Sequence, residues 1–422
     1  MNPAKEKSPR IHYAWFIFLG CCCTMAGGLG AVLNTSGVFY VPICNELGFS
    51  RGEISLFLSF YLVSMVIATP LVGHLLPRAN IRVLMSCMFI AVCIAEGMMS
   101  TYHHLWQWYL SGVIFGLCGS FVFILPTPLL IGNWFKKRTG LILGIAMSFS
   151  GIGTAIFSQL FTFFITTWGW RTTYVIVSII MAVLVLPWTF FVFRFRPADM
   201  GLLPYGATEE SPGSNNEGRK HKGMSGVPVK LAVLSVPFVC IFILSGCEEF
   251  FGGLTNHIAS FAVSIGETAA FGATLLSIIS IGNIVLKIGV GFLTDKIGII
   301  KTVYLQMLIA ALACVVFATT PSQAILYVGA FLLGVQNSVV TVSEPLLVRH
   351  FFGEKSYAQL YSFIRVAAGL MGAMGFPLVG FIFDTTGAYT LAFVIGICLA
   401  VFLAFLMFVA HKTKHKLVWE EE

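Results

Sequence analysis

The sequence predicts an all-α membrane protein whose twelve transmembrane helices form two pseudo-symmetric six-helix bundles. Hydrophobic residues make up 57% of the chain and charged residues only 10%, whereas about a quarter of the residues in a soluble domain are charged. The apolar stretches are long enough to cross a bilayer as helices, and they lack the alternating pattern of barrel strands. A Gly-rich turn that follows the second stretch recurs after the eighth, which indicates a duplicated chain.

The candidate spans fall into two sets on either side of one polar segment. The first set is 13–34, 53–76, 82–100, 105–131, 139–165 and 170–193, and the second is 231–262, 268–293, 300–318, 322–349, 357–381 and 387–410. The segment between them contains Pro, Gly and mixed charge, a composition typical of a flexible linker. The predicted organisation is an N-terminal bundle over 1–193, a cytoplasmic linker over 194–230, and a C-terminal bundle with a short tail over 231–422.

Lys and Arg are distributed unevenly between the two ends of the spans. Most of the 25 lie in the terminal tails and in every second connection, while the other connections carry Arg51 and Arg171. Because cytoplasmic loops are enriched in Lys and Arg, both termini are expected in the cytoplasm, with the protein in the plasma or inner cell membrane. The net charge of +7 then lies on the cytoplasmic face and requires no nucleic-acid partner. We expect a monomer surrounded by membrane lipids.

The internal repeat extends beyond the Gly-rich turns. The two copies of the turn are residues 73–82 and 291–301, and Pro-led segments at 128–135 and 345–352 follow the fourth and tenth spans. Two halves in parallel order are the symmetry of major facilitator transporters, in which the substrate site lies between the halves near the bilayer midplane.

The chain resembles the major facilitator superfamily over nearly all of its length. Residues 291–298 fit that family's Gly-x-x-x-Asp-(Arg/Lys)-x-Gly signature, while the first copy has Pro77 in place of Asp and Asn80 in place of Gly. Within the superfamily, the chain is similar to the monocarboxylate porters and the oxalate/formate antiporters. The stretches that carry this likeness are 12–15, 48–53, 134–140, 169–171 and 383–389. The resemblance implies a secondary transporter that works by alternating access.

Charged residues inside the spans are the candidates for function. A charge at the bilayer centre costs at least about 2.5 kcal/mol, so each one requires a partner, a water-filled cavity or a functional role. The six charged residues away from the loops are Glu96, Glu248, Glu249, Lys287, Glu344 and Arg365. All of these except Glu96 lie in the second half of the chain. We therefore expect the second half to bind the substrate and couple its transport, and the first half to close over the substrate.

Five polar residues are the candidates for substrate binding. Arg365 presents a planar fork that matches a carboxylate, and Tyr361 lies one turn before it on the same face. Lys287 follows Asn283 by one turn; the resemblance implies a comparison with an Asp-x-x-x-Arg pair of the monocarboxylate porters, in which Arg binds the substrate and Asp takes part in proton coupling. Asn34, at the end of span one, is a candidate hydrogen-bonding residue. The alternative for both cations is an ion pair with a membrane acid.

Three glutamates are the candidates for proton coupling. Glu248 and Glu249 lie in the middle of span seven and point about 100° apart, with Glu249 on a polar stripe. A buried carboxyl beside a cation is balanced between its charged and neutral forms, so it can load and release a proton. Glu344 lies late in span ten. The alternatives are fixed ion pairs with the membrane cations, or with Arg349 in the case of Glu344.

Two further titratable residues are expected to be structural. Glu96 lies near the outer end of span three, where a carboxylate easily reaches interfacial water. His257 lies near the outer end of span seven, where a rim position is expected.

The second Gly-rich turn is expected to act as a conformational gate. Its gate residues are Gly291, Asp295, Lys296 and Gly298. Asp295 is expected to accept bonds from the N-terminal amides of the next helix, and Lys296 to face carbonyls or lipid phosphates. Because Pro77 replaces the acid in the first copy, a weaker clasp is expected in the N-terminal half.

The function predicted from these features is secondary active transport of a small organic anion, a monocarboxylate, with proton symport or anion exchange. Alternatives are a proton-coupled carrier or exporter of a zwitterionic, cationic or hydrophobic molecule, and, more remotely, a membrane receptor. No enzyme activity is expected, because the sequence shows no nucleotide-binding loop or nucleophile–base pair. No cofactor or metal is expected either, since the 11 cysteines lack metal-ligand spacing and lie mostly inside spans.

Overall fold

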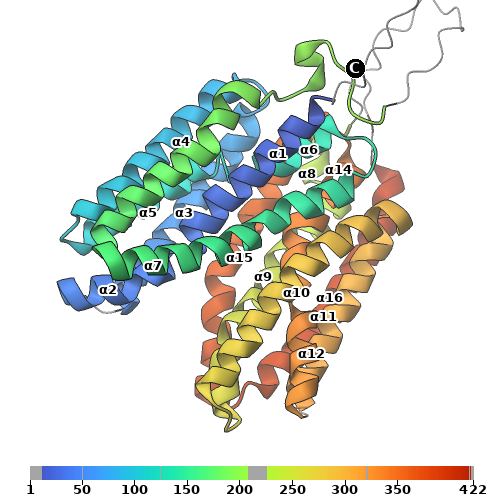
Figure 1. The fold of residues 1–422 in the computed structure, drawn as a ribbon. Helices are drawn as coiled ribbons and strands as arrows, with labels where there is room; N and C mark the ends of the chain where they lie inside the picture. Colours follow the sequence, from blue (N-terminus) through green and yellow to red (C-terminus); the bar gives the residue numbers. More distant parts are fainter. Residues whose placement is uncertain are drawn as a thin grey trace, which may run out of the picture.

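The computed structural model describes residues 12–49, 51–123, 125–207, 226–319, 322–417 and 419. Within these residues the fold is all-helical, and β-structure is limited to two isolated bridges. The helices form two bundles in chain order (Figure 1). This architecture confirms the predicted fold class.

The helices of the N-terminal bundle precede residue 193. They are α1 (Ala14–Thr24), a π-helix (Met25–Leu33), α2 (Gly37–Leu47), α3 (Arg51–Leu75), α4 (Ile81–Met98), α5 (Leu105–Gly119), α6 (Pro126–Trp134), α7 (Thr139–Pro187) and a second π-helix (Trp188–Val192). Short 3-10 turns follow α4 (Met99–Thr101) and the end of the bundle (Pro197–Met200).

The helices of the C-terminal bundle begin after residue 228. They are α8 (Val229–Val233), α9 (Val236–Ser264), α10 (Ala269–Ile297), α11 (Ile299–Thr319), α12 (Gln323–Leu333), α13 (Gln336–Ser338), a π-helix (Val339–Ser343), α14 (Glu344–Phe352), α15 (Tyr357–Thr386) and α16 (Thr390–Thr413). A 3-10 turn (Lys414–Lys416) follows α16.

Nine stretches of the described chain are long and apolar enough to cross a membrane. One of them, Thr139–Val192, contains two predicted spans that meet at Gly169, where a positive φ of 79° reverses the chain. A residue without a Cβ adopts that conformation at little cost. The α5–α6 pair and the helix α15 supply the remaining two of the twelve predicted spans.

Three spans that the sequence predicted as regular helices are irregular in the structure. Span one, predicted over 13–34, consists of α1 and a π-helix, and α2 follows it. Span four is interrupted between α5 and α6, and span ten consists of α12, α13, a π-helix and α14. Proline at the start of α6 and of α14 cannot donate a helical hydrogen bond, and the π-helix of span one contains three glycines. Irregular segments of this kind are tolerated in a membrane where neighbouring helices cover the backbone.

Side-chain caps set the beginnings of several long helices. Asn80 caps α4, Ser235 caps α9 and Thr268 caps α10, each with its side-chain oxygen accepting a backbone N–H of the first turn. At Gly298 a positive φ of 86° separates α10 from α11.

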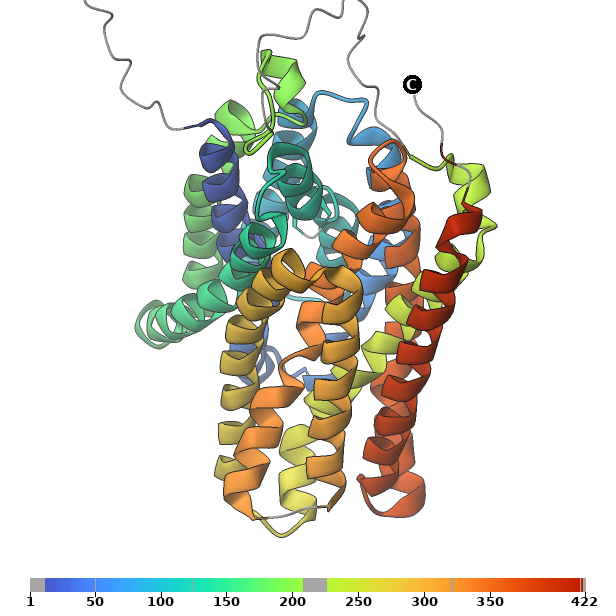
Figure 2. The same ribbon diagram turned by 90° about the vertical axis from the view of Figure 1, so that its right-hand side faces the viewer.

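The two bundles meet at one end of the molecule and diverge toward the other (Figures 1 and 2). We call the end at which α1 begins and α6 and α14 end the linker face, and the other end the opposite face. The bundles pack through α7 against α10 and through α3 against α15. A Cβ on Gly291 would overlap the carbonyl oxygen of Gly140, and one on Gly144 would overlap that of Lys287, so the backbones of α7 and α10 are in direct contact.

Candidate transport site and gate

A cavity of about 300 Å³ lies between the two bundles, and we call it the central cavity. The N-terminal bundle contributes a mostly apolar wall, whereas the C-terminal bundle contributes the charged groups Glu249 and Arg365. The cavity is lined by Leu29, Leu33, Asn34, Leu58, Tyr61, Leu62, Met65, Glu249, Arg365, Ala368, Gly369 and Gly372. A bound molecule would therefore meet charge on one side and mainly hydrocarbon on the other.

Arg365 lies between two carboxylates from different helices. Its Nη1 is 3.5 Å from Oε2 of Glu344 on α14, and its Nη2 is 3.9 Å from Oε1 of Glu249 on α9. Ser245 Oγ donates a hydrogen bond of 2.7 Å to the same Oε2 of Glu344. The Glu344 side chain is 1% exposed and the Glu249 side chain 18%, so Glu249 lies on the cavity wall with Glu344 behind it. One guanidinium is thus shared by two carboxylates, which leaves one negative charge uncompensated when both are ionised.

The neighbouring acid Glu248 lies outside this arrangement. It is buried, it does not line the central cavity, and its Oε1 has no hydrogen-bond partner among the described residues. Adjacent positions on a helix point in different directions, so only one of the pair can share a face with Arg365.

The other residues predicted to bind substrate are divided between the cavity wall and the packed interior. Asn34 lines the central cavity and donates a 3.0 Å hydrogen bond from Nδ2 to Oγ1 of Thr154. Tyr361 is buried and stacks on Tyr357, and its hydroxyl has no partner among the described residues. It does not contribute to the cavity lining.

Neither Lys287 nor Asn283 lines the central cavity. The backbone of Lys287 lies against Gly144 of α7, and the backbone of Asn283 lies against Gly334, which follows α12. Lys287 is 4% exposed, and no ion pair joins it to a carboxylate in the part of the chain that the structure describes. The alternative reading, an ion pair between Lys287 and a span-seven acid or Glu344, is therefore not formed in this conformation. The structure does not bring Lys287 and Arg365 to one surface.

Asp295 joins the two bundles at the linker face. Its Oδ1 accepts the backbone N–H of Gly140 at 2.9 Å, and its Oδ2 accepts that of Leu141 at 2.8 Å. Both donors belong to the first turn of α7, where amides are unpaired within the helix and the helix dipole favours a negative charge. The expectation that Asp295 would bind the next helix in sequence, α11, is wrong. The contact of Gly291 with Gly140 brings the start of α7, rather than that of α11, to the carboxylate.

A second contact between the bundles lies close to the first. The Lys136 ammonium forms an ion pair with Glu354, and Nη2 of Arg349 approaches Oε1 of the same carboxylate at 2.5 Å. Burial alone would raise the pKa of Glu354, but the charge and hydrogen bond of Arg349, with those of Lys136, lower it below its ordinary value. Arg349 thus pairs with Glu354, so the alternative pairing of Arg349 with Glu344 does not form.

The other residues of the Gly-rich turns make different contacts. The Lys296 ammonium lies 5.9 Å from the centroid of the Phe292 ring on its own helix. In the first copy of the turn, Pro77 replaces the acid. There His74 contacts Gln359 on α15, with 3.1 Å between His74 Nδ1 and Gln359 Nε2. The carboxylate-to-amide clasp therefore belongs to the second copy.

With this geometry established, comparison with known proteins identifies the family. The profile described as Major Facilitator Superfamily matches residues 16–375. The chain belongs to this superfamily. Monocarboxylate transporter 12 of Xenopus laevis is 22% identical over 413 residues, covering 91% of this chain and 85% of that protein. The uncharacterized MFS-type transporter YhjX of Escherichia coli (strain K12) is 23% identical over 381 residues, covering 88% of this chain and 87% of that protein. Among solved structures, the superfamily transporter FucP in the outward conformation has the same fold, with a TM-score of 0.72 at 12% identity over 94% of this chain and 99% of that one.

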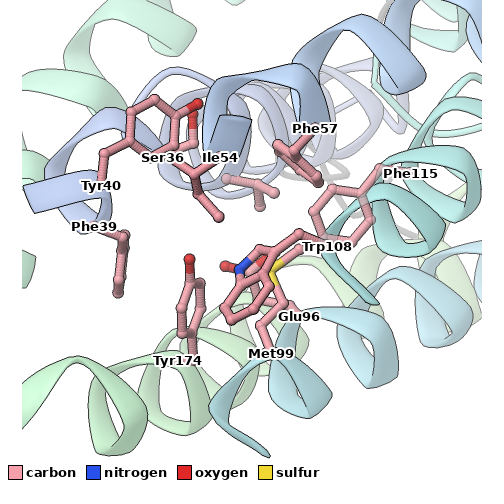
Figure 3. Close-up of a pocket in the computed structure, with 11 residues that line it drawn as sticks. Ser36, Phe39, Tyr40, Ile54, Phe57, Glu96, Met99, Trp108, Phe115 and Tyr174 are labelled. Carbon is pink, nitrogen blue, oxygen red and sulfur yellow. The ribbon is translucent and has the colours of Figure 1, made fainter. Parts of the chain in front are cut away.

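This superfamily member also contains a small pocket inside its N-terminal bundle (Figure 3). Glu96 is 4% exposed, and its carboxylate has no hydrogen bond or ion pair among the described residues. Aromatic rings surround it, including Trp108 and Tyr174, and Tyr40 of α2 lies across the pocket from them (Figure 3). The space of about 10 Å³ is close to that of one water molecule. The expectation that Glu96 reaches interfacial water is wrong, because the α2 segment and these rings cover the end of α4.

Three contributors to the site and gate were not found from the sequence. Ser245 is the hydrogen-bond donor to Glu344, and Lys136 and Glu354 form the second contact between the bundles. A signal for the last two was present, because each follows a copy of the repeated Pro-led segment. No comparable signal marked Ser245, whose role depends on the approach of α14 to α9.

Proposed function

We propose that this protein is a secondary transporter that moves a small organic anion, a monocarboxylate, through the central cavity together with a proton. The observation that carries the proposal is the position of Arg365 between Glu249 and Glu344 in the cavity wall. The similarity to monocarboxylate transporter 12 of Xenopus laevis supports an anionic substrate.

The charge balance of these three residues links the anion to a proton. Arg365 remains protonated at any biological pH, so only the two glutamates can change charge. With both ionised, the group carries a net negative charge and repels an incoming carboxylate. A proton on Glu249 removes an attraction to Arg365 of roughly 4 kcal/mol, taking the 3.9 Å separation and an effective dielectric constant of 20. The guanidinium fork is then available to the substrate.

The two glutamates have different roles in this scheme. Glu249 lies on the cavity wall, so it is the carboxyl that the substrate displaces and that takes the proton. Glu344, which is held by Ser245 and almost fully buried, stays as the permanent counter-ion of Arg365. Glu248 has no part in the transfer.

The remaining predicted binding residues have secondary roles in the proposal. Asn34 supplies a hydrogen-bonding group from the opposite wall, and Tyr361 supports the base of the Arg365 helix. Lys287 and Asn283 act later in the cycle: separation of α7 from α10 would expose Lys287 to the exit path and give the anion a second cation on leaving.

The proposed mechanism is alternating access by the two bundles, 1–193 and 231–422, on either side of the central cavity. Asp295 and Glu354 hold the bundles together at the linker face, and the excess of Lys and Arg there supports a cytoplasmic location for this face and both termini. The conformation described is then closed to the cytoplasm, which agrees with the similarity to FucP in the outward conformation.

Uptake by proteoliposomes tests the proposal directly. The protein is reconstituted with an inward proton gradient, and uptake is measured for mono- and dicarboxylates, amino acids and amines. We expect the proton gradient to drive uptake of a monocarboxylate, and we expect Arg365→Gln to abolish that uptake. Glu249→Gln is expected to lose the stimulation by the gradient while still exchanging substrate in counterflow.

The matched control is Glu96→Gln, which removes a buried carboxylate that does not line the central cavity and should leave uptake unchanged. Undiminished uptake of every carboxylate by Arg365→Gln would disprove the anion site. Exchange without any effect of the gradient in the unmodified protein would instead favour anion exchange. Uptake of amines alone would favour the alternative of a cationic substrate, which the excess of membrane acids also permits.

A further inference from the structure

A second polar cavity lies at the linker face, within the N-terminal part of the chain. It has a volume of about 400 Å³ and is formed by the turn between α3 and α4 and by the segment that follows the last π-helix of this bundle. Figure 2 shows that segment, in green at the top, beside the blue turn. Its charged lining groups are Arg78, Arg82, Arg194, Arg196 and Asp199. Four guanidiniums and one carboxylate thus converge on one concave surface.

The positive charge of this cavity is not neutralised by the protein. Among the described residues, no ion pair joins any of the four guanidiniums to a carboxylate. Asp199 uses Oδ2 to accept the backbone N–H of Arg196 at 3.0 Å. Arg194 uses Nη1 to donate to the carbonyl oxygens of Phe191 and Phe193, at 3.3 and 3.0 Å, and its other guanidinium nitrogens have no partner in the described structure.

The two remaining arginines of the turn also keep donors for a ligand. Arg78 contacts the ring of His74 with Nη1, and the Arg82 guanidinium has no hydrogen bond to another described group. Arg82 is half-buried, as are Arg194 and Arg196, so three of the four side chains are partly covered by the protein rather than fully extended into solvent. The guanidinium fork of an arginine recognises phosphate with paired hydrogen bonds.

The departure of the first Gly-rich turn from its signature explains the excess charge. In the second copy, Asp295 supplies a negative charge beside Lys296, whereas the first copy has Pro77 at the position of the acid. The first turn therefore lacks the negative charge that the second turn carries, and Arg194 and Arg196 add positive charge from the other side. Selection for orientation in the membrane requires cations on this face, but it does not require four of them to line one cavity.

The cavity also lies at the ends of candidate membrane spans, where lipid headgroups are expected. It is bounded by the end of α3, the beginning of α4 and the end of the last span of the N-terminal bundle, which are all ends of membrane spans. We propose that it binds the phosphate of an anionic lipid headgroup. Basic pockets at the ends of membrane helices suit such headgroups, and a phosphate here would join the α3–α4 turn to the segment that leads into the linker. The proposal does not depend on the identity of the transported substrate.

Native mass spectrometry of the full-length detergent-purified protein tests the site. The probes are phosphatidic acid, which presents a phosphate monoester, phosphatidylcholine, and soluble glycerol phosphate. We expect retention of phosphatidic acid in preference to phosphatidylcholine. Arg82→Gln and Arg194→Gln are each expected to weaken that retention about tenfold or more, since each removes a charged hydrogen-bond donor from a different wall.

Two further variants distinguish the phosphate site from general loss of charge or of folding. Arg82→Lys keeps the charge without the fork and is expected to give intermediate retention. Lys412→Gln removes a cation from α16, where its ammonium lies 4.9 Å from the Phe408 ring, and should bind as the unmodified protein does. All variants are compared only if their melting temperatures match. Equal retention of both lipids, or equal losses in Arg82→Gln and Lys412→Gln, would overturn the proposal. Binding of glycerol phosphate as strong as that of the lipid would retain the phosphate site but overturn its assignment to lipid.

Discussion

Replacing Asp295 by Asn is expected to loosen the closed end of the protein. The carboxylate accepts two amide N–H bonds, of 2.9 and 2.8 Å, from the first turn of α7. Hydrogen bonds to a charged group contribute about 1.5–3 kcal/mol each, and a helix N-terminus adds up to about 2 kcal/mol for a nearby negative charge. Asp295 is exposed to solvent and Asn keeps one acceptor oxygen, so we take the loss as about 1–2 kcal/mol after screening. The ratio of closed to open conformations should then fall by roughly 5-fold to 30-fold.

Hydrogen–deuterium exchange in lipid nanodiscs measures this change. The amides of Gly140 and Leu141 report the broken bonds, and amides near Ser148 report separation of the helices, because its Oγ donates to the carbonyl oxygen of Ile284 at 3.1 Å. We expect exchange in both regions of α7 to accelerate in Asp295→Asn. Lys296→Gln is the matched control, since its ammonium contacts a ring on its own helix. Unchanged exchange near Ser148 in Asp295→Asn, or equal acceleration in the control, would refute a clasp between the bundles.

Three other outcomes follow from the contacts described. The pKa of Glu354 is lowered in the closed structure, because Arg349 and Lys136 outweigh the effect of burial. The stabilisation of the closed conformation by Glu354 is therefore complete above the ordinary glutamate pKa of about 4.3. It is lost only as the pH falls through the lowered pKa of Glu354 in the closed structure. Spin-label distances between α6 and α14 should accordingly be equal at about pH 7.5 and pH 5, and a large increase at the lower value would contradict this reading. Glu96→Gln should raise the melting temperature by a few degrees, because replacing an unpaired buried acid is expected to stabilise the fold by about 1 kcal/mol. A lower melting temperature in Glu96→Gln would show that the Glu96 carboxylate is stabilised in the fold. Tyr361→Phe should leave the melting temperature within about 2 °C, because its hydroxyl has no partner in the described structure, and a larger loss would reveal one.

The general architecture could be predicted from the sequence because it depends on composition and repetition. Apolar length, the duplicated turns and the distribution of Lys and Arg are properties of the chain itself. The π-helical segments of spans one and ten and the interruption of span four were not predicted, although glycine and proline were visible there. Whether such residues interrupt a helix depends on the neighbouring helices that satisfy the freed backbone groups.

The candidate site was predictable as a set of residue types but not as an arrangement. Arg365 and Glu249 could be selected because charges in a span are rare, and the structure places both on the cavity wall. The position of Lys287 against α7 could not be inferred, since helical periodicity gives a face but not the helix that covers it. The same limit applies to Asp295, whose partner belongs to the other bundle, and to Glu96, which the α2 segment covers.

The division of the central cavity between a charged wall and a hydrocarbon wall separates two properties that a carrier must control. In the proposed mechanism, the glutamate that takes the proton belongs to one half of the polypeptide, and the Leu and Met side chains that would touch the tail of a substrate belong to the other. Under the proposed mechanism, substitutions at Leu29, Leu58 or Met65 are expected to change which molecules are accepted without altering the coupling to protons. A related transporter with a different N-terminal half could accept a different substrate while keeping the proposed coupling to protons.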